Sequence, residues 1–395
     1  VLLPVRHKRA RAWRLVEVKS SASVQDYQRD DAAVQTFVAR AAGVPLAGVA
    51  LAHLDSAWVY PGGGNYQGLL RETDQTDAAL GREETVRSWI ADAQRVAARS
   101  KEPRTATGRH CTEPFECGFR AYCESREPQP EHPVRWLPGP FNKALSVHLE
   151  ATGTTELREV PDALLNDRQR RVKTATLSGA VHFDRKGAAR ALSGHGLPAY
   201  FLDFETVQFA VPIWKGTRPY QQIPFQFSVH RLARSGTLEH REFLDLGGKD
   251  PSRALAQALL AACGRRGPIF AYNAPFETRC IRGLAERFPR LAAELSALAE
   301  RMVDLLPVAR DHYYHPSQCG SWSIKSVLPA ICPDLHYDEL DGIRDGGMAM
   351  AGFLEAIAPE TTAARKAEID RQLRAYCALD TQALVRLWSM FTGRA

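Results

Sequence analysis

The stretch YFLDFET, residues 200–206, decides how the second half of this chain folds. Its apolar residues are those of a buried β-strand, whose side chains point alternately to the two faces of a sheet. Asp203 and Glu205 are two positions apart, so both project from the same face. Burying two like charges together is costly unless a cation compensates them, and Mg²⁺ and Mn²⁺ prefer oxygen ligands. The stretch therefore predicts a site for divalent metal ions.

Two segments further along the chain carry matching acids. The segment AYNAPFE, residues 271–277, reads as a strand end that turns into a helix bearing Glu277. The segment AYCALDT, residues 375–381, lies in a long helical run that places Tyr376 and Asp380 one turn apart on one face. We expect these side chains to converge with the pair on the strand.

From Pro198 onward the pattern is that of an α/β domain. Three strands, a helix, a strand and further helices are compatible with a mixed sheet covered by helices on both faces. The strand-like runs are residues 200–204, 225–232, 242–246 and 268–272. The helix-like runs are residues 252–263, 276–288, 324–331, 347–357 and about 364–390.

This constellation resembles the DEDD exonuclease superfamily, whose fold is ribonuclease H-like. Its motifs are D-x-E, N-x-x-F-D and, in the tyrosine subgroup, Y-x-x-x-D. The matching residues are Asp203 and Glu205 for the first motif, Asn273 and Glu277 for the second, and Tyr376 and Asp380 for the third. One departure is Glu277, which stands where the family has Asp. The segment 320–329, with Asp304 before it, also resembles an uncharacterised bacterial family in which such a domain follows a RecB-like one.

The resemblance implies a metal-dependent nuclease that hydrolyses phosphodiester bonds of DNA or RNA as a 3′-to-5′ exonuclease. Two Mg²⁺ or Mn²⁺ ions about 4 Å apart would activate a water and stabilise the leaving oxygen. Asp203, Glu205 and Asp380 would be metal ligands, and Glu277 a fourth or an outer ligand. Tyr376 would orient the attacking water. The alternative is a catalytically inactive protein that keeps the nuclease folds to bind nucleic acid or to act as a scaffold.

A second possible site lies near the N-terminus, in the segment RLVEVKSS, residues 14–21. Glu17 and Lys19 share one face of a strand and resemble the E-x-K half of the PD-(D/E)XK signature of RecB-like nucleases. The resemblance implies that Glu17 binds metal, and that Lys19 stabilises charge at the attacked phosphate. Gln35, on the following helix, resembles the glutamine of the next RecB motif. A surface ion pair on a strand is the competing interpretation.

The beginning of the chain predicts a truncated N-terminus. Residues 1–5 already read as the middle of a strand, and with residues 13–19 they form a hairpin around the basic tip 6–9. The tip could contact phosphate, or it could be a solvated loop. No acid occurs in residues 1–16, where the family's aspartate is expected, so the second site lacks a metal ligand. A helix over residues 26–42, a strand over 49–59 and a helix over 83–98 follow.

Three of the eight cysteines lie close together in HCTEPFECGFRAYC, residues 110–123. Cys111, Cys117 and Cys123 resemble the C-terminal cysteines of iron–sulfur RecB-type nucleases. There, three closing cysteines and one from upstream ligate a 4Fe-4S cluster that ties the ends of the domain together. Zinc, held by the three thiolates and His110, is the alternative.

We therefore expect an α/β protein, with a ribonuclease H-like mixed sheet and flanking helices preceded by a partial PD-(D/E)XK (RecB-like) domain. The expected parts are the partial domain with its cysteines over 1–124, a linker and small helical segment over 125–195, and the ribonuclease H-like domain over 196–395. Lys and Arg outnumber Asp and Glu by 51 to 45, an excess that suits a nucleic-acid partner. No apolar run is long enough for a membrane span and no export signal is visible, so we expect a cytoplasmic protein. The oligomeric state stays open.

Overall fold

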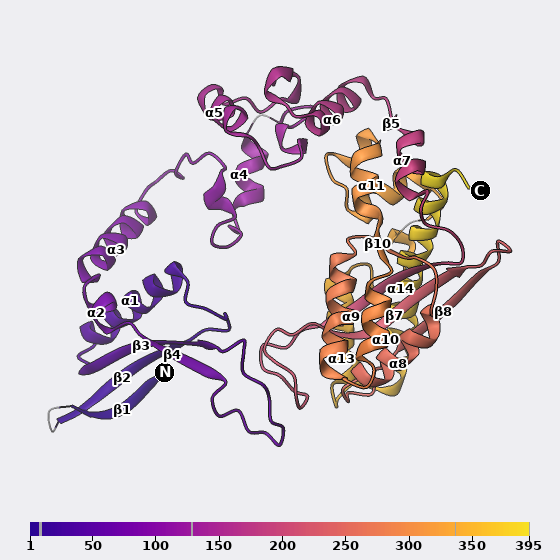
Figure 1. The fold of residues 1–395 in the computed structure, drawn as a ribbon. Helices are drawn as coiled ribbons and strands as arrows, with labels where there is room; N and C mark the ends of the chain where they lie inside the picture. Colours follow the sequence, from indigo (N-terminus) through magenta and orange to yellow (C-terminus); the bar gives the residue numbers. More distant parts are fainter. Residues whose placement is uncertain (8–9, 128, 336, 395) are drawn as a thin grey trace. The chain divides into compact units, whose positions relative to one another are not determined.

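The chain is a mixed α/β protein with two mixed sheets and flanking helices, as its computed structural model shows (Figure 1). The structure describes residues 1–7, 10–127, 129–335 and 337–394. Contacts divide the chain into two compact units. Unit 1 comprises residues 1–129 and 208–221, and unit 2 comprises residues 130–207 and 222–395. None of the described helices is both long and apolar enough to cross a membrane.

Unit 1 is built on a four-stranded sheet of order β1-β2-β3-β4. The expected hairpin is confirmed, because β1 and β2 pair antiparallel, while β2 and β3 run parallel. Residues 8 and 9 of its basic tip lie outside the described residues. The elements are β1 (Leu2–His7), β2 (Ala10–Val18), α1 (Asp26–Ala41), β3 (Leu46–Leu54), β4 (Leu70–Asp74), α2 (Thr76–Leu80), α3 (Glu83–Ala97), the 3₁₀ turn η1 (Arg109–Cys111) and α4 (Arg120–Arg126).

Two expected strand ends in unit 1 were wrong by a few residues. The strand expected to reach Val59 ends at Leu54, because the backbone turns there and the Trp58 amide donates to the Asp55 carbonyl at 3.0 Å. The strand with the E-x-K pair ends at Val18, so Lys19 lies one residue beyond it.

Unit 2 begins with a helical part and continues into a five-stranded sheet. Its helices are α5 (Lys143–Thr152), α6 (Asp167–Ser178), α7 (Arg185–Leu192), α8 (Ser252–Cys263), α9 (Pro275–Arg287), α10 (Ala292–Ala299), α11 (Leu305–His312), α12 (Ile324–Ile331), α13 (Gly346–Ile357) and α14 (Ala363–Thr392). Its strands are β5 (His182–Phe183), β6 (Ala199–Val207), β7 (Ile223–Leu232), β8 (Leu238–Leu244), β9 (Ile269–Ala271), β10 (Met302–Asp304) and β11 (Tyr313–Tyr314). Its 3₁₀ turns are η2 (Val134–Trp136), η3 (Leu157–Glu159), η4 (Asp162–Leu164), η5 (Pro316–Gln318) and η6 (Tyr337–Glu339).

The segment expected to be a linker with short helices, residues 125–195, contains α5, α6 and α7. Part of it buries a small apolar core of its own, which includes Leu145, Leu157 and Val160. Two of its helices, α5 and α6, begin or end at capping residues that the sequence offers. Asn142 and Asn166 accept hydrogen bonds at helix N-termini, and a left-handed glycine, Gly153, follows α5.

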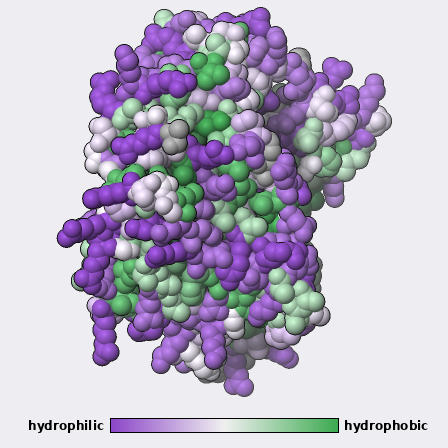
Figure 2. All heavy atoms as spheres, turned by 90° about the vertical axis from the view of Figure 1, so that its right-hand side faces the viewer, coloured by the Kyte–Doolittle hydropathy of each residue, from purple (hydrophilic) through white to green (hydrophobic). Residues whose placement is uncertain are grey.

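The large sheet of unit 2 has the order β10-β9-β6-β7-β8. Strands β6, β7 and β8 are antiparallel neighbours, whereas β9 and β10 run parallel to β6. Strand β8 starts at Leu238, four residues before the expected start at Glu242. On the face drawn in Figure 2, hydrophilic side chains cover most of the surface and apolar patches lie between them. Most of the buried apolar side chains of unit 2 form two cores, one on each face of the five-stranded sheet.

Alternate residues of β6 belong to different cores, as expected for a strand buried on both faces. Tyr200, Leu202 and Phe204 pack with residues of α8, α9 and α10 in one core. Ala199 and Phe201 pack in the other core, with residues of α7, α11 and α14. Asp203 and Glu205 continue the second series, so they share the face of the sheet that α14 covers.

Candidate metal centre

Asp203 and Glu205 lie in the middle and second half of β6, with Cys377 of α14 beside them. Donor atoms of these three side chains lie within 4.8 Å of one another. Among the described residues, no other group of three His, Cys, Asp or Glu side chains gathers its donor atoms in this way. Glu205 is buried and Asp203 is half-buried, so the two carboxylates are largely removed from water.

Helix α14 is held against the sheet by side chains of β7, the neighbour of β6. The Gln226 amide donates to the Leu373 carbonyl at 2.9 Å, and the hydroxyls of Ser228 and Thr381 are 2.7 Å apart. In the register of the sheet, Gln226 is the partner of Glu205 and Ser228 the partner of Asp203. The residues that dock α14 are therefore directly opposite the two acids.

Docking of α14 brings Asp380 into the same electrostatic environment. Asp380 and Tyr376 are both buried, and the Tyr337 hydroxyl donates a hydrogen bond to Asp380 Oδ1. Burial raises the pKa of Asp203 well above its ordinary value, and the charges of Asp380 and Glu205 raise it further. The thiol of Cys377 lies 3.9 Å from Asp203 Oδ2, which joins helix and strand at this point. The acids of the first and third segments thus interact electrostatically, while Asp380 lies outside the group of donor atoms within 4.8 Å of one another.

Glu277 enters from the strand end that turns into α9. Asn273 adopts the left-handed conformation that asparagine tolerates, and its amide donates to Asp304 Oδ1 at 2.9 Å. Pro275 then starts the helix, and Glu277 lies in its first turn. Glu277 is buried and its Oε2 atom has no hydrogen-bond partner among the described residues. Its charge contributes to the raised pKa of Asp203, so it faces the same acids.

Lys325 is a cation that acts on two of the acids. The charge of Lys325 lowers the pKa values of Glu205 and Asp380, opposing the effect of burial. Its ammonium group lies 5.5 Å from the ring centre of Tyr337 and 5.6 Å from that of Tyr376, and it donates to the Arg344 carbonyl at 2.7 Å. The charge of Arg279 lowers the pKa of Glu277 in the same way. Two cations cannot neutralise four carboxyl groups, so the net charge of the ionised site is negative.

The pKa values follow from this crowding. Burial raises the pKa of Glu205 to about 8, and the charge of Asp380 adds to the shift. Burial also raises the pKa of Glu277 to about 8. Burial raises the pKa of Asp380 to about 6, although hydrogen bonds from Tyr337 and Tyr376 oppose the shift. Without a cation, the site therefore holds protons that free carboxyl groups would release.

We expect the metal-free protein to lose stability as pH rises from about 5 to 8. The folded-state pKa of Glu205 is about 8 and its ordinary value is 4.5. The folded state thus binds more protons in this window, and its stability falls until the folded group ionises. Glu205→Gln should reduce the loss by roughly 3 to 4 kcal/mol. Thermal unfolding in EDTA at pH 5 and at pH 8 measures this loss of stability.

The control is Glu300→Gln, which changes an exposed residue. An equal dependence of stability on pH in the unaltered protein and in both variants would contradict the prediction.

Three residues of this site were missed in the sequence. Cys377 follows Tyr376 directly, and Lys325 lies in the quoted segment 320–329, yet neither has a motif role that would single it out. No sequence motif pointed to Tyr337, because it lies in a short 3₁₀ turn between two helices. Gly342 allows the next turn to pass close to α14, since a Cβ atom there would stand 2.4 Å from the Gln372 side chain.

The second expected site forms a polar network in unit 1. Lys19 Nζ lies 2.8 Å from Glu17 Oε1 and also pairs with Asp31 of α1. Gln35 Nε2 donates to Asp31 Oδ1 at 3.3 Å. Partial burial lowers the pKa of Lys19. The hydrogen bonds to Asp31 and Glu17 outweigh this effect, so the pKa of Lys19 is raised. The structure thus brings Glu17, Lys19 and Gln35 together around an acid that the sequence interpretation did not name.

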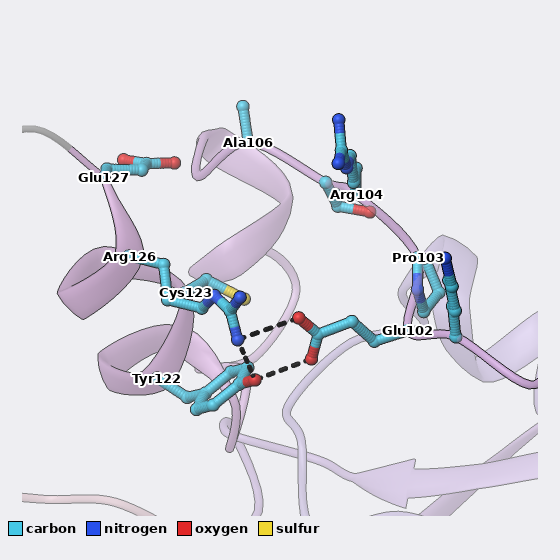
Figure 3. Close-up of a pocket in the computed structure, with 10 residues that line it drawn as sticks. Glu102, Pro103, Arg104, Ala106, Tyr122, Cys123, Arg126 and Glu127 are labelled. Atoms are coloured by element: carbon cyan, nitrogen blue, oxygen red, sulfur yellow. Dashed lines mark hydrogen bonds and ion pairs between the residues drawn. The ribbon is translucent and has the colours of Figure 1, made fainter.

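The three cysteines of the expected cluster are free. Cys111 is buried, and the Cys117 amide donates to its carbonyl at 2.8 Å. Cys123 lines an open pocket of about 820 Å³ beside Tyr122 and Arg126, where Glu102 binds both of these side chains (Figure 3). The three sulfurs do not form a group within 4.8 Å among the described residues. The side chains as they lie here do not fit a shared metal, so the 4Fe-4S cluster and zinc stay predictions from the sequence.

One part of this site lies in a segment that matches a known family model. No curated protein and no solved structure matches the chain. The segment that does match begins at the first residue of YFLDFET and includes Asp203, Glu205 and Glu277. It ends before Tyr376 and Asp380. Residues 200–323 match the family described as a domain of unknown function, DUF2779.

Proposed function

We propose that this chain is a metal-dependent nuclease that hydrolyses phosphodiester bonds of DNA or RNA through unit 2. The observation that carries the proposal is the close group that Asp203 and Glu205, on β6, form with Cys377 of α14, together with the charge of Asp380, one turn along that helix, which raises the pKa of both acids. Asp380 lies about 175 positions from these two acids in the sequence, yet its charge raises the pKa of both. Burying like charges together destabilises a fold. We therefore infer that these acids are present because the function of the protein requires them.

The donor set fits divalent metal ions. Asp203, Glu205 and Asp380 offer carboxylate oxygens, and Glu277 offers a buried oxygen that no described group satisfies. Hard cations such as Mg²⁺ and Mn²⁺ prefer oxygen donors, and their charge would offset the repulsion. When bound, two such ions polarise the phosphodiester and make water acidic enough to attack it at neutral pH.

The chain's own residues would orient the reaction. The Tyr376 hydroxyl forms a hydrogen bond with Asp380 and would hold the attacking water. Lys325, held by the Arg344 carbonyl, places a positive charge near Glu205 and Asp380. That charge favours the ionised carboxylates, which are the forms that bind metal.

We propose the finer fold assignments on the same grounds. The mixed sheet of unit 2, with the acids on one face and α14 over them, supports a ribonuclease H-like domain with DEDD-type motifs. The network of Glu17, Lys19, Asp31 and Gln35 supports a partial PD-(D/E)XK domain in unit 1. Polarity from the 3′ end rests on the resemblance alone.

The test is cleavage of 5′-labelled oligonucleotides of DNA and RNA by the full chain. We expect a ladder of products shortened from the 3′ end with Mn²⁺ or Mg²⁺, and none with EDTA. The ladder would distinguish stepwise removal of nucleotides from internal cuts. Intact substrate with both metals, from protein shown to be folded, would refute the nuclease proposal.

A second candidate function is binding without hydrolysis. The observation that favours it is Glu277, whose arm is one methylene longer than that of the aspartate in the resembling family. A misplaced ligand can abolish chemistry while the fold survives. This candidate expects salt-sensitive binding of oligonucleotides and no cleavage, so the same assay with a binding measurement separates the two.

A further inference from the structure

We propose that two segments of unit 1 form a binding surface for the unpaired bases of single-stranded nucleic acid. The proposal rests on the proposed function, because it names the form of nucleic acid that the chain takes. The segments are residues 58–71 and 208–221. We call this the aromatic surface and define it by Trp58, Tyr60, Tyr66, Lys215, Arg218 and Tyr220.

The two segments are joined by hydrogen bonds. The Tyr60 amide donates to the Thr217 carbonyl at 2.9 Å, and the Gly216 amide donates to the Tyr60 carbonyl at 2.8 Å. At the end of the second segment, the Tyr220 hydroxyl donates to the Ser20 carbonyl. Tyr220 has a φ of 56°, a conformation that side-chain-bearing residues rarely adopt without support from their surroundings. The segment 208–221 is therefore held in one defined arrangement on unit 1.

Three aromatic rings lie together on this surface, and two of them are stacked. The rings of Tyr60 and Tyr66 are 4.9 Å apart and inclined by only 2°. Trp58 lies 5.9 Å from the first ring and 6.3 Å from the second. Tyr60 is buried beneath the stack, whereas Tyr66 is 39% exposed. An unpaired base can extend the stack beyond Tyr66, and every base has the flat face that this contact requires.

Glycines bring the second segment close to the rings. Gly62, Gly63 and Gly64 all have positive φ, and the Gly64 amide donates to the Tyr60 hydroxyl at 2.9 Å. The stem of Lys215 lies 3.5 Å from where a Cβ atom on Gly62 would stand. Contact with the glycine backbone thus positions the lysine near the aromatic stack.

The charge of the surface selects the partner. Neither segment contains an Asp or a Glu. Lys215 and Arg218 are exposed, and within the part of the chain that the structure describes neither takes part in an ion pair, whereas Arg71 lies 3.6 Å from Asp55. Exposed aromatic faces beside unpaired cations suit bases and phosphates respectively. Double-stranded nucleic acid keeps its bases stacked inside the helix, so it cannot use the aromatic part.

Binding of fluorescein-labelled oligothymidylate to the full chain tests the proposal, measured by anisotropy in EDTA so that no cleavage occurs. We expect Tyr66→Ala to weaken binding by about 5- to 150-fold, and Tyr66→Phe to bind like the unaltered protein because it keeps the ring. Lys215→Gln and Arg218→Gln should each reduce the slope of log affinity against log salt by about 0.7. Exposed Lys249→Gln is the matched control and should leave the slope unchanged.

Several outcomes would overturn the proposal. One is equal affinity of Tyr66→Ala and the unaltered protein, and another is equal affinity for a duplex of the same length. A third is a change in sedimentation of the Tyr66→Ala chain without a change in oligonucleotide binding, which would assign the surface to a protein contact. Circular dichroism checks folding, and the exposed Lys215 and Arg218 variants stay informative should Tyr66→Ala fail to fold. Because binding is measured without metal, the binding result can be interpreted even if the cleavage test fails.

Discussion

The variant Asp203→Asn should lose metal-dependent hydrolysis of single-stranded oligonucleotides by a factor of about 10³ or more. Asp203 interacts electrostatically with the three other acids, because the charges of Asp380, Glu205 and Glu277 each raise its pKa. Asparagine keeps the size of the side chain but removes the charge that holds a divalent ion. The loss should therefore appear in the rate with saturating substrate, measured by the release of labelled nucleotides.

The control for this variant is Asp311→Asn. Asp311 is exposed and pairs with Arg168 at 2.7 Å on the surface of unit 2, an interaction of small energetic value. The Asp311→Asn variant should cleave oligonucleotides at the rate of the unaltered protein. Asp203→Asn should still bind oligothymidylate, since the aromatic surface lies in unit 1. Persistent cleavage by the Asp203→Asn, Asp380→Asn double variant would place hydrolysis elsewhere or in a contaminant.

Mn²⁺ should stabilise unit 2, and Asp380→Asn should abolish that effect. An ion that binds only the folded state at 100 times its dissociation constant contributes about 2.7 kcal/mol. For a unit of this size the midpoint of thermal unfolding should rise by about 5 to 10 °C. Scanning calorimetry with and without Mn²⁺ measures the rise, and EDTA should reverse it.

Without metal, the expected effect of Asp380→Asn on stability is the opposite. Asp380→Asn removes one of the charges that repel one another and keeps an oxygen that can accept from the Tyr337 hydroxyl. The metal-free variant should therefore be at least as stable as the unaltered protein at pH 8. Lower stability in EDTA, with an intact response to Mn²⁺, would mean that Asp380 serves packing and does not hold metal.

Much of the local structure of unit 2 follows from short-range patterns. The expected helices over residues 252–263, 276–288 and 324–331 are confirmed within one residue at the ends. The expected final helix over about 364–390 is confirmed as Ala363–Thr392. Helical spacing and turn residues report on a few neighbours in the chain, and such neighbours decide where helices begin and end.

Other features were beyond the reach of the sequence because they depend on contacts between distant segments. Tyr337 reaches Asp380 across 43 positions, and Asp31 reaches Lys19 from a different element. No spacing rule connects such pairs, so neither residue had a signal. The cysteine spacing, in contrast, suggested a shared ligand set that the described positions of the three sulfurs do not form.

The sequence by itself determined that Asp203 and Glu205 share one face of a strand, and that Tyr376 and Asp380 share one face of a helix. Both results follow from the fixed periods of strand and helix. Only the tertiary structure decided that these two faces meet, because the meeting depends on Gln226 binding the Leu373 carbonyl across 147 positions and on the core beneath α14. It likewise decided that residues 208–221 belong with unit 1, since packing between distant segments is a property of the whole fold.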